Sequence, residues 1–294
     1  MSFTTVTSNA KSWFADAVAI KAADAVPEAL ALNTYVATQC AVDDGDARRV
    51  LVPYIDTDPV AATVKEGAEI TTGDPTLDEL SFPTVKVGLL HTLSNEAMRA
   101  VTEGTSTKGS VSASEQLSTS LQRAVTAKLD SLMLTTPAPS SKDDPAAEYP
   151  AAGLAVMNGA VQGGTIDSDL TPLLDAIATI TENGATPTAI VMAPTAWAKI
   201  LKLTAKDGRP LLGGDVQVAT ALQLFGLPVV INSHMPANGV LVVDSTNVFA
   251  AVTDLAVAVD GSAAFKNDSS MIRVTARIGW GVARPNRHAI LIVK

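Results

Sequence analysis

The three histidines of this chain are the side chains best suited to acid–base chemistry or to metal binding. A zinc site needs about four ligands held close together, and histidine ligands commonly stand at short, regular spacing. His91, His234 and His288 instead lie far apart, each in a strand-like or loop-like stretch. We therefore expect no metal centre. We interpret His91 as a hydrogen-bonded structural residue on an apolar strand, and His288, next to Arg287, as a solvated or interface side chain.

Cysteine and carboxylate chemistry have no better support in the sequence. Cys40 is the single cysteine, so it cannot form an internal disulfide, and its surroundings are not those of a catalytic nucleophile. We expect it to be a small buried apolar group. The acidic run at residues 43–46 lacks the spaced ligands of a calcium loop and is typical of a turn. Because the sequence also has no phosphate-binding loop, dinucleotide fingerprint or nucleophile elbow, we predict neither an enzyme nor a bound cofactor.

The composition excludes several classes of protein. The chain has 294 residues, of which 47% are hydrophobic and 17% charged, with a net charge of -9 and a mean hydropathy of +0.25. This apolar content excludes global disorder and suffices for one large or two modest domains. The negative charge repels polyanions, so tight electrostatic binding of nucleic acid is not expected. High apolarity with few charges indicates that much surface is buried against other copies of the chain.

The sequence shows no membrane or secretion signal. The longest apolar runs have the length of strands, far short of the roughly 18 residues that indicate a transmembrane helix. Asp16, Lys21 and Asp24 interrupt the stretch that would form the core of a signal peptide. We therefore expect no membrane partner and synthesis in the cytoplasm.

Two strand-like stretches in the first third of the chain flank a long polar segment. Residues 48–55 and 80–92 have the alternating, β-branched pattern of strands. The 24 residues between them are polar, are interrupted by Gly and Pro, and are too poor in apolar side chains to form a core. The simplest arrangement is a two-stranded arm that projects from the body. Because an isolated hairpin is marginally stable in water, we expect a neighbouring molecule to stabilise it.

Two helices are predicted on either side of this arm. Residues 11–25 form an amphipathic segment whose apolar residues must pack on another surface. A much longer helix is predicted at residues 112–134, which begin with a capping box and carry an apolar residue at every fourth position. This second helix is the clearest element of the chain and should cross most of a domain.

The remaining elements are shorter. Helices are predicted at residues 95–103, 169–183, 194–204 and 216–225, and strands at residues 188–192, 227–232, 240–244, 248–252, 255–259, 271–283 and 289–293. A polar, glycine-rich loop at residues 205–215 separates two of the helices. The order is an arm, a hairpin, a long helix, an α/β insertion and a closing sheet, which predicts an α+β protein.

This order, together with three stretches of sequence, resembles the Hong Kong 97-type major capsid proteins of tailed bacteriophages. The extended loop of that family and the start of its first body helix are similar to VKEGAEI and LDELSFPTVKVGLLHTLSNEAM. The spine helix is similar to SASEQLSTSLQRAVTAKLDSLML. The return through the axial domain into the peripheral domain is similar to FGLPVVINSHMPANGVLVVDSTNVFAAVTD and IRVTARIGWGVARPNRHAILIV. The resemblance extends from about residue 30 to residue 293.

The resemblance implies the Hong Kong 97-type capsid fold. Its segments would be an N-terminal arm (1–47), an extended hairpin loop (48–92), a peripheral domain whose first part (93–162) holds the spine helix, an axial domain (163–260) and the return strands of the peripheral domain (261–294). The implied function is self-assembly through hexamers and pentamers into an icosahedral shell around the double-stranded DNA of a tailed phage. A portal, a separate scaffold, decoration proteins and weakly bound DNA are the further partners that the resemblance suggests.

Contacts between subunits are then expected in three places. The expected contact residues are Lys65, Glu66, Glu69 and Lys86 on the hairpin, Lys206, Asp207 and Arg209 on the axial loop, and Trp13, Phe14 and Val18 on the N-terminal segment. Charge pairs at such interfaces govern register and partner choice more than affinity. Substitution of the charged residues should therefore affect assembly more than folding of the subunit.

Two features depart from the family pattern. About 47 residues precede the first hairpin strand, fewer than the scaffolding segment of many members would need, so a separate scaffold or none is predicted. The family prototype links subunits by an isopeptide bond between a hairpin lysine and an asparagine, for which the candidates are Lys65, Lys86, Asn267 and Asn286. Since nothing in the sequence indicates a desolvated pocket that would activate a lysine, we expect these lysines to pair with carboxylates instead.

Two alternative functions remain open. An encapsulin, a cellular compartment with the same fold, would use its N-terminal helix to hold a cargo peptide, and genomic neighbours would distinguish it from a phage protein. A small-molecule-binding α/β enzyme domain at residues 163–260 would need a concave pocket with convergent polar groups. The sequence offers no such group of residues, and this alternative would gain support only from a bound cofactor or from turnover that depends on His234.

Overall fold

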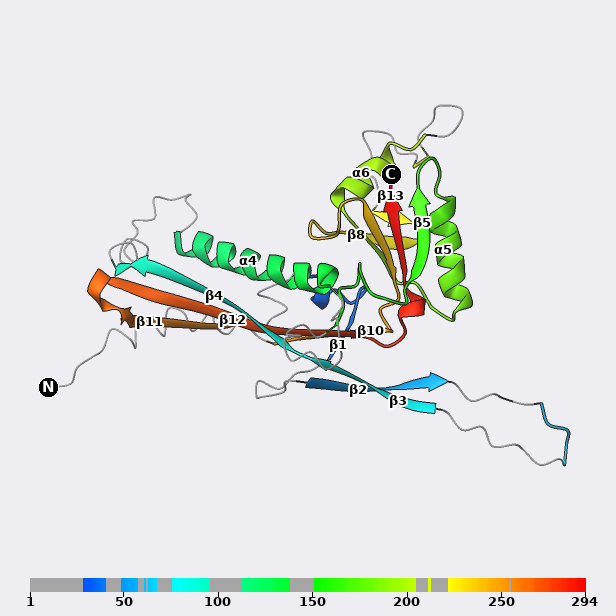
Figure 1. Ribbon diagram of the computed structural model, residues 1–294, viewed down its shortest axis with the longest axis horizontal. Helices are drawn as coiled ribbons and strands as arrows, with labels where there is room; N and C mark the ends of the chain where they lie inside the picture. The colour runs from blue at the N-terminus through cyan, green and yellow to red at the C-terminus, as the bar shows by residue number, and fades with distance from the viewer. Residues whose placement is uncertain are drawn as a thin grey trace.

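In the residues that the structure describes, the fold consists of a six-stranded sheet with two helices, a five-stranded sheet covered by one long helix, and a two-stranded hairpin arm (Figure 1). It is seen in a computed structural model, which describes residues 29–40, 49–57, 61, 63–67, 76–95, 113–137, 151–204, 211–212, 222–253 and 255–294. The helices predicted at residues 11–25 and 95–103 lie outside these residues, apart from Asn95 at the start of the second. Within the described residues, no helix is long and apolar enough to cross a membrane.

The six-stranded sheet holds the most deeply buried of the described strands. Its order is β5 (Val161–Ile166), β13 (Ala289–Val293), β9 (Gly239–Val243), β6 (Ala189–Met192), β8 (Leu227–Ile231) and β7 (Gln223–Leu224). Helices α5 (Thr171–Glu182) and α6 (Pro194–Leu201) pack against it. Every residue of β6 and β9 is buried, as expected for central strands that are covered on both faces.

The five-stranded sheet is organised around its longest strand, β12 (Ser269–Val282). One edge of β12 pairs with β4 (Val85–Ser94), and the other pairs with β10 (Val248–Val252) and then with β11 (Ala256–Ala264). The short strand β1 (Thr38–Gln39) adds to β10 in parallel. Two 3-10 turns, η2 (Phe265–Asn267) and η3 (Pro285–Arg287), lie at the two ends of β12.

Helix α4 (Ala113–Thr135) crosses the five-stranded sheet at β4 and confirms the long helix predicted at residues 112–134. Its 23 residues correspond to a length of about 35 Å. Val125, Leu129 and Met133, from the predicted apolar stripe, are buried. The 3-10 turn η1 (Leu30–Leu32) packs against the same helix.

The hairpin arm is formed by the antiparallel strands β2 (Arg49–Thr57) and β3 (Thr76–Pro83), which confirms the predicted hairpin. The prediction of one continuous strand at residues 80–92 was wrong, because β3 ends at Pro83 and β4 begins at Val85. Pro83 is the last residue of β3 that pairs with β2, opposite Arg49, and it has no backbone N–H to donate to a further partner. The chain therefore changes partner at this point, from β2 in the arm to β12 in the body.

The helix predicted at residues 216–225 was wrong at its C-terminal end, and residues 216–221 lie outside the described part of the chain. Gln223 and Leu224 form β7, which turns back at Phe225 and Gly226 to pair with β8. Both turn residues have positive φ, 51° and 80°, as a two-residue hairpin turn of type I′ requires. The apolar spacing of this stretch had favoured a helix, but turn geometry and pairing with β8 override it.

Strand β5 was not predicted, because its sequence VQGGTI is polar and contains two glycines. The structure explains Gly163. A Cβ atom at this position would lie 2.6 Å from Cγ of Leu291 on β13 and 2.8 Å from Cβ of Ala176 on α5. Since contacts under 3.0 Å are not tolerated, only glycine allows α5 to lie this close to the sheet.

The other predicted helices and strands of the second half are present within a few residues of their expected ends. The two sheets, however, divide the chain differently from the boundary predicted at residue 260. Strands β10 and β11, on the axial side of that boundary, pair with β12 in the five-stranded sheet. Strand β13, expected among the closing strands of the peripheral domain, pairs with β5 and β9 in the six-stranded sheet.

Candidate assembly surfaces

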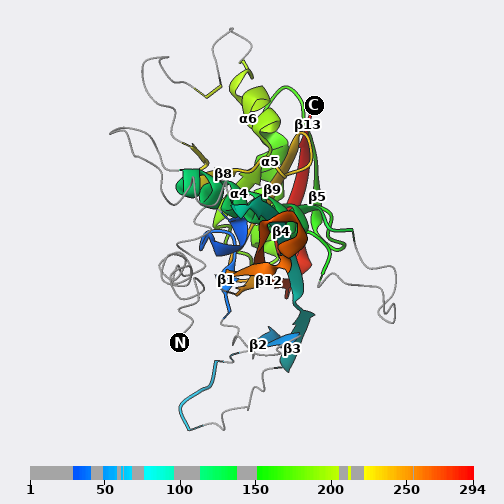
Figure 2. The ribbon, with the colours of Figure 1, turned by 90° about the vertical axis from the view of Figure 1, so that its left-hand side faces the viewer.

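The hairpin arm exposes large apolar side chains on a part of the molecule that has no core of its own. Leu77, Leu51 and Ile55 are 75%, 58% and 43% exposed, and Ile55 and Leu77 are direct cross-strand partners. Figure 2 shows β2 and β3 projecting away from the two larger sheets. A two-stranded sheet with exposed apolar side chains is typical of a surface that another molecule covers.

The base of the arm is held by one buried aromatic ring. Phe82 is 1% exposed and packs against β12. A Cβ atom at Gly281 would lie 2.6 Å from Cδ1 of this ring, and one at Gly279 would lie 3.2 Å from Cδ2. The two glycines therefore make room for Phe82, and this fit fixes where the arm leaves the body.

A cation provides a second connection between the arm and the body. Arg284, just after β12, donates a hydrogen bond to the backbone carbonyl of Ile55 and lies 5.9 Å from the centre of the Tyr54 ring. The Tyr54 hydroxyl donates to Asp78 across the hairpin at 2.8 Å. This hydrogen bond, with one from the backbone N–H of Glu79, lowers the pKa of Asp78. The arm is thus oriented by polar contacts while its apolar side chains stay free.

The predicted contact residues of the hairpin lie in two different regions. Lys65 and Glu66 are exposed on the segment that joins β2 to β3, whereas Glu69 lies outside the described residues. Lys86 is also exposed but belongs to β4, where it stands opposite Arg277 of β12, and so it is not part of the two-stranded arm.

The other two predicted contact sets, Lys206, Asp207 and Arg209 of the axial loop and Trp13, Phe14 and Val18 of the N-terminal segment, lie outside the described residues. The base of the axial loop is described. The backbone N–H of Leu211, within the loop, donates to the carbonyl of Leu203 at 2.9 Å, just beyond α6.

The candidates for a crosslink are exposed in the described structure. Lys65 and Lys86 are solvent-accessible, and so are Asn267 in η2 and Asn286 in η3. An amine is activated for attack on an amide by removal from water, which none of these positions provides within one chain. The absence of self-crosslinking therefore stays a prediction, supported by this exposure.

The interpretation of His288 as a solvated or interface residue was wrong, because its side chain is 0% exposed. It lies where the chain passes from η3 into β13, beside Asp244 at the end of β9, whose backbone N–H donates to His288 Nδ1 at 3.4 Å. Burial lowers the pKa of His288 to about 4, although the Asp244 carboxylate acts in the opposite direction. The imidazole is therefore neutral at pH 7, and its Nε2 atom has no hydrogen-bond partner among the described residues.

Asp244 is itself buried, and its carboxylate organises the junction between the two sheets. Oδ1 accepts hydrogen bonds from the backbone N–H and the hydroxyl of Thr246 at 3.0 and 2.7 Å. Oδ2 accepts from the backbone N–H of Thr186 at 3.1 Å and from the side-chain amide of Asn247 at 2.7 Å. These contacts satisfy the hydrogen-bonding capacity of the buried Asp244 carboxyl group, so this residue has a structural explanation.

The remaining candidates for chemistry are separated in the fold. His91 is half-buried on β4, and His234 is half-buried after β8, where its backbone N–H donates to Asn232. Cys40 is half-buried rather than buried, and burial raises the pKa of its thiol, which disfavours the reactive thiolate. Within the described residues, no group of three or more His, Cys, Asp or Glu side chains could hold a metal ion.

The exposed apolar residues of the arm are contact candidates that sequence reasoning missed. Leu51, Ile55 and Leu77 lie in strand-like stretches, where apolar residues normally face a core. The available signal was the lack of apolar residues around them that could form that core. Arg284 gave no local signal, because its partners Ile55 and Tyr54 are more than 200 residues away in the sequence.

Comparison with known proteins gives a consistent result. The sequence profile of the phage capsid family matches residues 146–293, half of the chain. No curated protein sequence matches. Among solved structures, the fold is similar to a chain from Microbacterium phage Oxtober96 (TM-score 0.67, 13% identity, 91% of each chain covered) and to one from Mycobacterium phage Bobi (0.65, 16%, 90% of each). It is also similar to the capsid of a native GTA particle (0.62, 17%, 89% of this chain and 90% of that chain).

These similarities agree with the α+β architecture described above. The structural matches, all under 25% identity, establish the Hong Kong 97-type fold, and the profile match establishes the family. The chain belongs to the phage capsid family, and its role is that of a structural major capsid protein.

Proposed function

We propose that this chain assembles through hexamers and pentamers into an icosahedral shell that encloses the double-stranded DNA of a tailed phage. The observation that carries the proposal is the hairpin arm, which exposes Leu51, Ile55 and Leu77 without a core beneath them. In the assembled shell, this apolar face of the arm lies over an adjacent copy. The contact removes from water the surface that folding of one chain leaves exposed.

The two sheets suggest how the subunit is divided in the shell. The six-stranded sheet, with α5 and α6, is the axial domain, and the loop that carries Lys206, Asp207 and Arg209 faces the symmetry axis of the capsomer. The five-stranded sheet with α4 is the peripheral domain. This proposal keeps the two predicted domains but moves β10 and β11 to the peripheral domain and β13 to the axial domain, in agreement with their strand partners.

The proposed partners follow from charge and from the shell itself. A net charge of -9 keeps contacts with packaged DNA weak and non-specific. A portal, decoration proteins and a separate scaffold are further candidates, and synthesis takes place in the host cytoplasm. We assign the subunit no reaction of its own, since its buried polar cluster at Asp244 and His288 serves the packing of the two sheets.

The assembly role of the arm is tested by placing a charge on each of its faces. Leu77→Asp puts a carboxylate in the proposed contact, whereas Thr76→Asp, the matched control, adds the same charge to the neighbouring exposed position on the opposite face. We expect folded subunits from both variants by circular dichroism, and closed shells or capsomers by negative-stain electron microscopy and light scattering only from Thr76→Asp. Normal shells from Leu77→Asp would contradict the proposal.

The predicted charge contacts are tested in the same assay. Glu66→Lys on the arm and Arg209→Glu on the axial loop should each give a soluble folded subunit that does not close shells, because inverted charges disturb register between copies. If both variants assemble normally, these two positions are not contacts.

A further inference from the structure

The six-stranded and five-stranded sheets share no strand pairing within the described residues. The chain crosses between them at residues 244–247, from β9 to β10, and at residues 283–288, from β12 to β13. These crossings lie side by side, because the backbone N–H of Ala283 donates to the carbonyl of Asn247 at 3.0 Å. Strand β5, which follows α4, begins beside the second crossing, where its first residue donates to the carbonyl of His288. These links between the sheets meet at one place, as in a hinge.

A buried carboxylate joins the two parts of the molecule away from this hinge. Asp130 of α4 is 4% exposed, and its Oδ2 atom accepts a hydrogen bond at 2.7 Å from the side-chain amide of Asn232, which follows β8. Its Oδ1 atom accepts from the backbone N–H of Leu30 at 2.8 Å. One side chain thus holds together α4, the six-stranded sheet and the first described segment of the chain.

The hinge and the Asp130 contact lie at opposite ends of the six-stranded sheet. The first crossing leaves β9 at the end where β9 pairs with Ala189 of β6. Asn232 follows β8 at the other end, and its backbone N–H donates to the carbonyl of Met192 at 3.0 Å. Ala189 and Met192 are the two ends of β6, about 10 Å apart. A contact placed at a distance from a hinge restrains rotation about that hinge.

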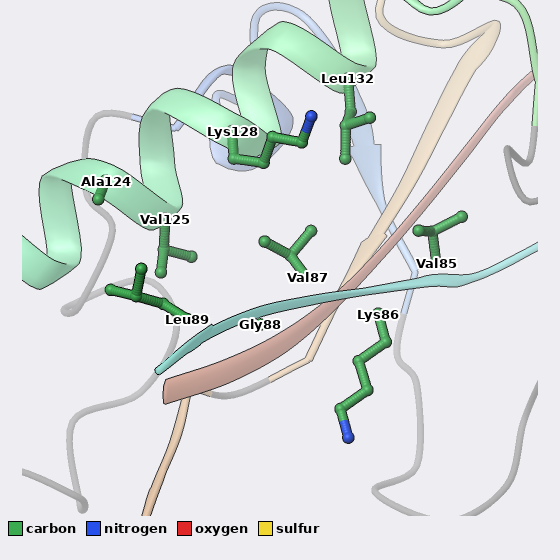
Figure 3. A pocket seen from close by; sticks show the side chains of 9 residues that line it. All are labelled: Val85, Lys86, Val87, Gly88, Leu89, Ala124, Val125, Lys128 and Leu132. Carbon is green, nitrogen blue, oxygen red and sulfur yellow. The ribbon is translucent and has the colours of Figure 1, made fainter. Parts of the chain in front are cut away.

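Helix α4 contacts the two parts of the molecule with different sides. The side that borders a cavity beside β4 carries Val125, Lys128 and Leu132 (Figure 3). Asp130 is two residues from both Lys128 and Leu132, which corresponds to a rotation of about 200° around the helix. Asp130 therefore lies on the opposite side, toward Leu30 and the six-stranded sheet. The helix packs on the five-stranded sheet with one side and holds the other sheet through the second.

Residues 29–40, which we call the strap, run from the Asp130 contact to the hinge. The strap ends in β1, which pairs with β10 just after the first crossing. The hydroxyl of Thr38 donates to the carbonyl of Ser245, within that crossing, at 2.8 Å. Val36, between the two ends of the strap, is 0% exposed. The strap is therefore packed into the molecule and is attached at both the hinge and Asp130.

We propose that Asp130 is a latch, whose contacts with Asn232 and Leu30 fix the orientation of the six-stranded sheet relative to α4. Loss of these contacts lets that sheet turn about the hinge. The latch belongs to the single subunit and does not depend on the proposed function. An intact latch makes each subunit present the surfaces of its two sheets at one angle, and only the consequence of this angle for hexamers and pentamers rests on the proposed function.

The test is the distance between two spin labels, one on each side of the hinge. In the full-length chain with Cys40→Ser, labels are attached at Thr92→Cys on β4 and at Asp175→Cys on α5, both exposed positions. Double electron–electron resonance gives the distribution of distances. Unlabelled chain of the same variant is added in excess, so that distances within one chain dominate whether or not the chains assemble.

Three substitutions are compared in this doubly labelled chain. Asn232→Ala removes the amide that contacts Asp130 and keeps the contact with Leu30, whereas Asp130→Ala removes both. The matched control is Thr136→Val, at the C-terminal end of α4. It deletes another buried hydrogen bond, from the Thr136 hydroxyl to the carbonyl of Leu132 at 2.6 Å, which does not connect the two sheets.

We expect one narrow distribution in the unsubstituted chain and in Thr136→Val. Both latch variants should give a broader distribution that is shifted by several ångströms. An unchanged distribution in folded Asn232→Ala would overturn the proposal, and so would an equal shift in Thr136→Val. If Asp130→Ala does not fold, Asn232→Ala gives the result by itself. A shift in variants that form no shells would support the latch and count only against the proposed function.

A second measurement follows the strap by hydrogen exchange and mass spectrometry. Asp130→Ala should speed exchange in the peptide that contains Leu30 about tenfold, the factor that corresponds to losing one hydrogen bond to a carboxylate. Asn232→Ala should change this rate much less, because the contact between Leu30 and Asp130 remains. Unchanged exchange in folded Asp130→Ala would contradict the role of the latch in holding the strap.

Discussion

The six-stranded sheet and the hairpin arm use similar strand sequences in opposite ways. In the sheet, every residue of β6 and β9 is buried, so apolar side chains stabilise the fold of one chain. In the arm, Leu51, Ile55 and Leu77 remain 43–75% exposed although they lie in regular β-pairing. The first set of apolar residues stabilises the fold of one chain, whereas the second set is the one that we propose to make contacts between copies. The predictions below separate the two.

The largest loss of stability is expected from Trp280→Ala, in the core of the body. Trp280 is 0% exposed and its indole N–H donates to the carbonyl of Ala152 at 3.0 Å. Its removal leaves a cavity and an unsatisfied carbonyl, so the free energy of unfolding should fall by about 3–5 kcal/mol. Urea denaturation measures this change. The control is Leu90→Ala, at a 60% exposed position on β4. If this substitution lowered the free energy of unfolding by more than about 1 kcal/mol, the distinction between buried and exposed apolar residues would be contradicted.

A pH-dependent loss of nearly the same size is expected from His288. Its pKa is about 4 in the fold, below the ordinary histidine value of 6.5, so the unfolded chain binds the proton more readily. Stability from the neutral imidazole is fully present above pH 6.5, declines as the pH falls below 6.5 and is lost near pH 4. The difference corresponds to roughly 3 kcal/mol.

Unfolding by urea between about pH 7.5 and pH 4 measures this dependence. His288→Gln should be less stable at neutral pH but should lose less stability on acidification than the unsubstituted chain. The control is His234→Gln, at a half-buried position, which should keep the full dependence. If the two variants respond to pH alike, burial of His288 is not the cause.

An intermediate effect is expected where the arm joins the body. Gly281→Ala places a Cβ atom 2.6 Å from the buried Phe82 ring, which has little room to move, so the free energy of unfolding should fall by about 1–3 kcal/mol. Gly261→Ala is the control, because its Cβ atom would meet Ser270 at an ordinary 3.7 Å. The arm should also change direction in the Gly281→Ala variant. The yield of shells from this variant should therefore fall by more than its loss of folding stability explains.

The smallest effect on stability is expected in the arm itself. Leu51→Ser removes a side chain that is 58% exposed, and the free energy of unfolding should change by less than about 0.5 kcal/mol. The yield of shells, measured by light scattering, should nevertheless fall. A large loss of stability with normal assembly would reverse the roles that the comparison assigns to the two regions.

Elements with strong local patterns could be predicted from the sequence. The long helix α4 follows from apolar residues at every fourth position, and the hairpin arm follows from two alternating stretches around a polar segment. The site could be predicted only in part. Lys65 and Glu66 are exposed, and their role in contacts between subunits stays a prediction. The exposed apolar residues of the arm were missed, because exposure depends on what the rest of the chain fails to cover.

The sequence by itself determined the order of the elements, the absence of a recognisable catalytic motif and the family. Only the tertiary structure decided which sheet each late strand joins, because β10 and β13 have similar apolar sequences and their partners are set by distant residues. It likewise decided that His288 is buried and that the absence of a side chain at Gly163 lets α5 pack closely against the sheet. Periodicity acts between neighbours along the chain, whereas burial and close approach arise between segments that meet only after folding.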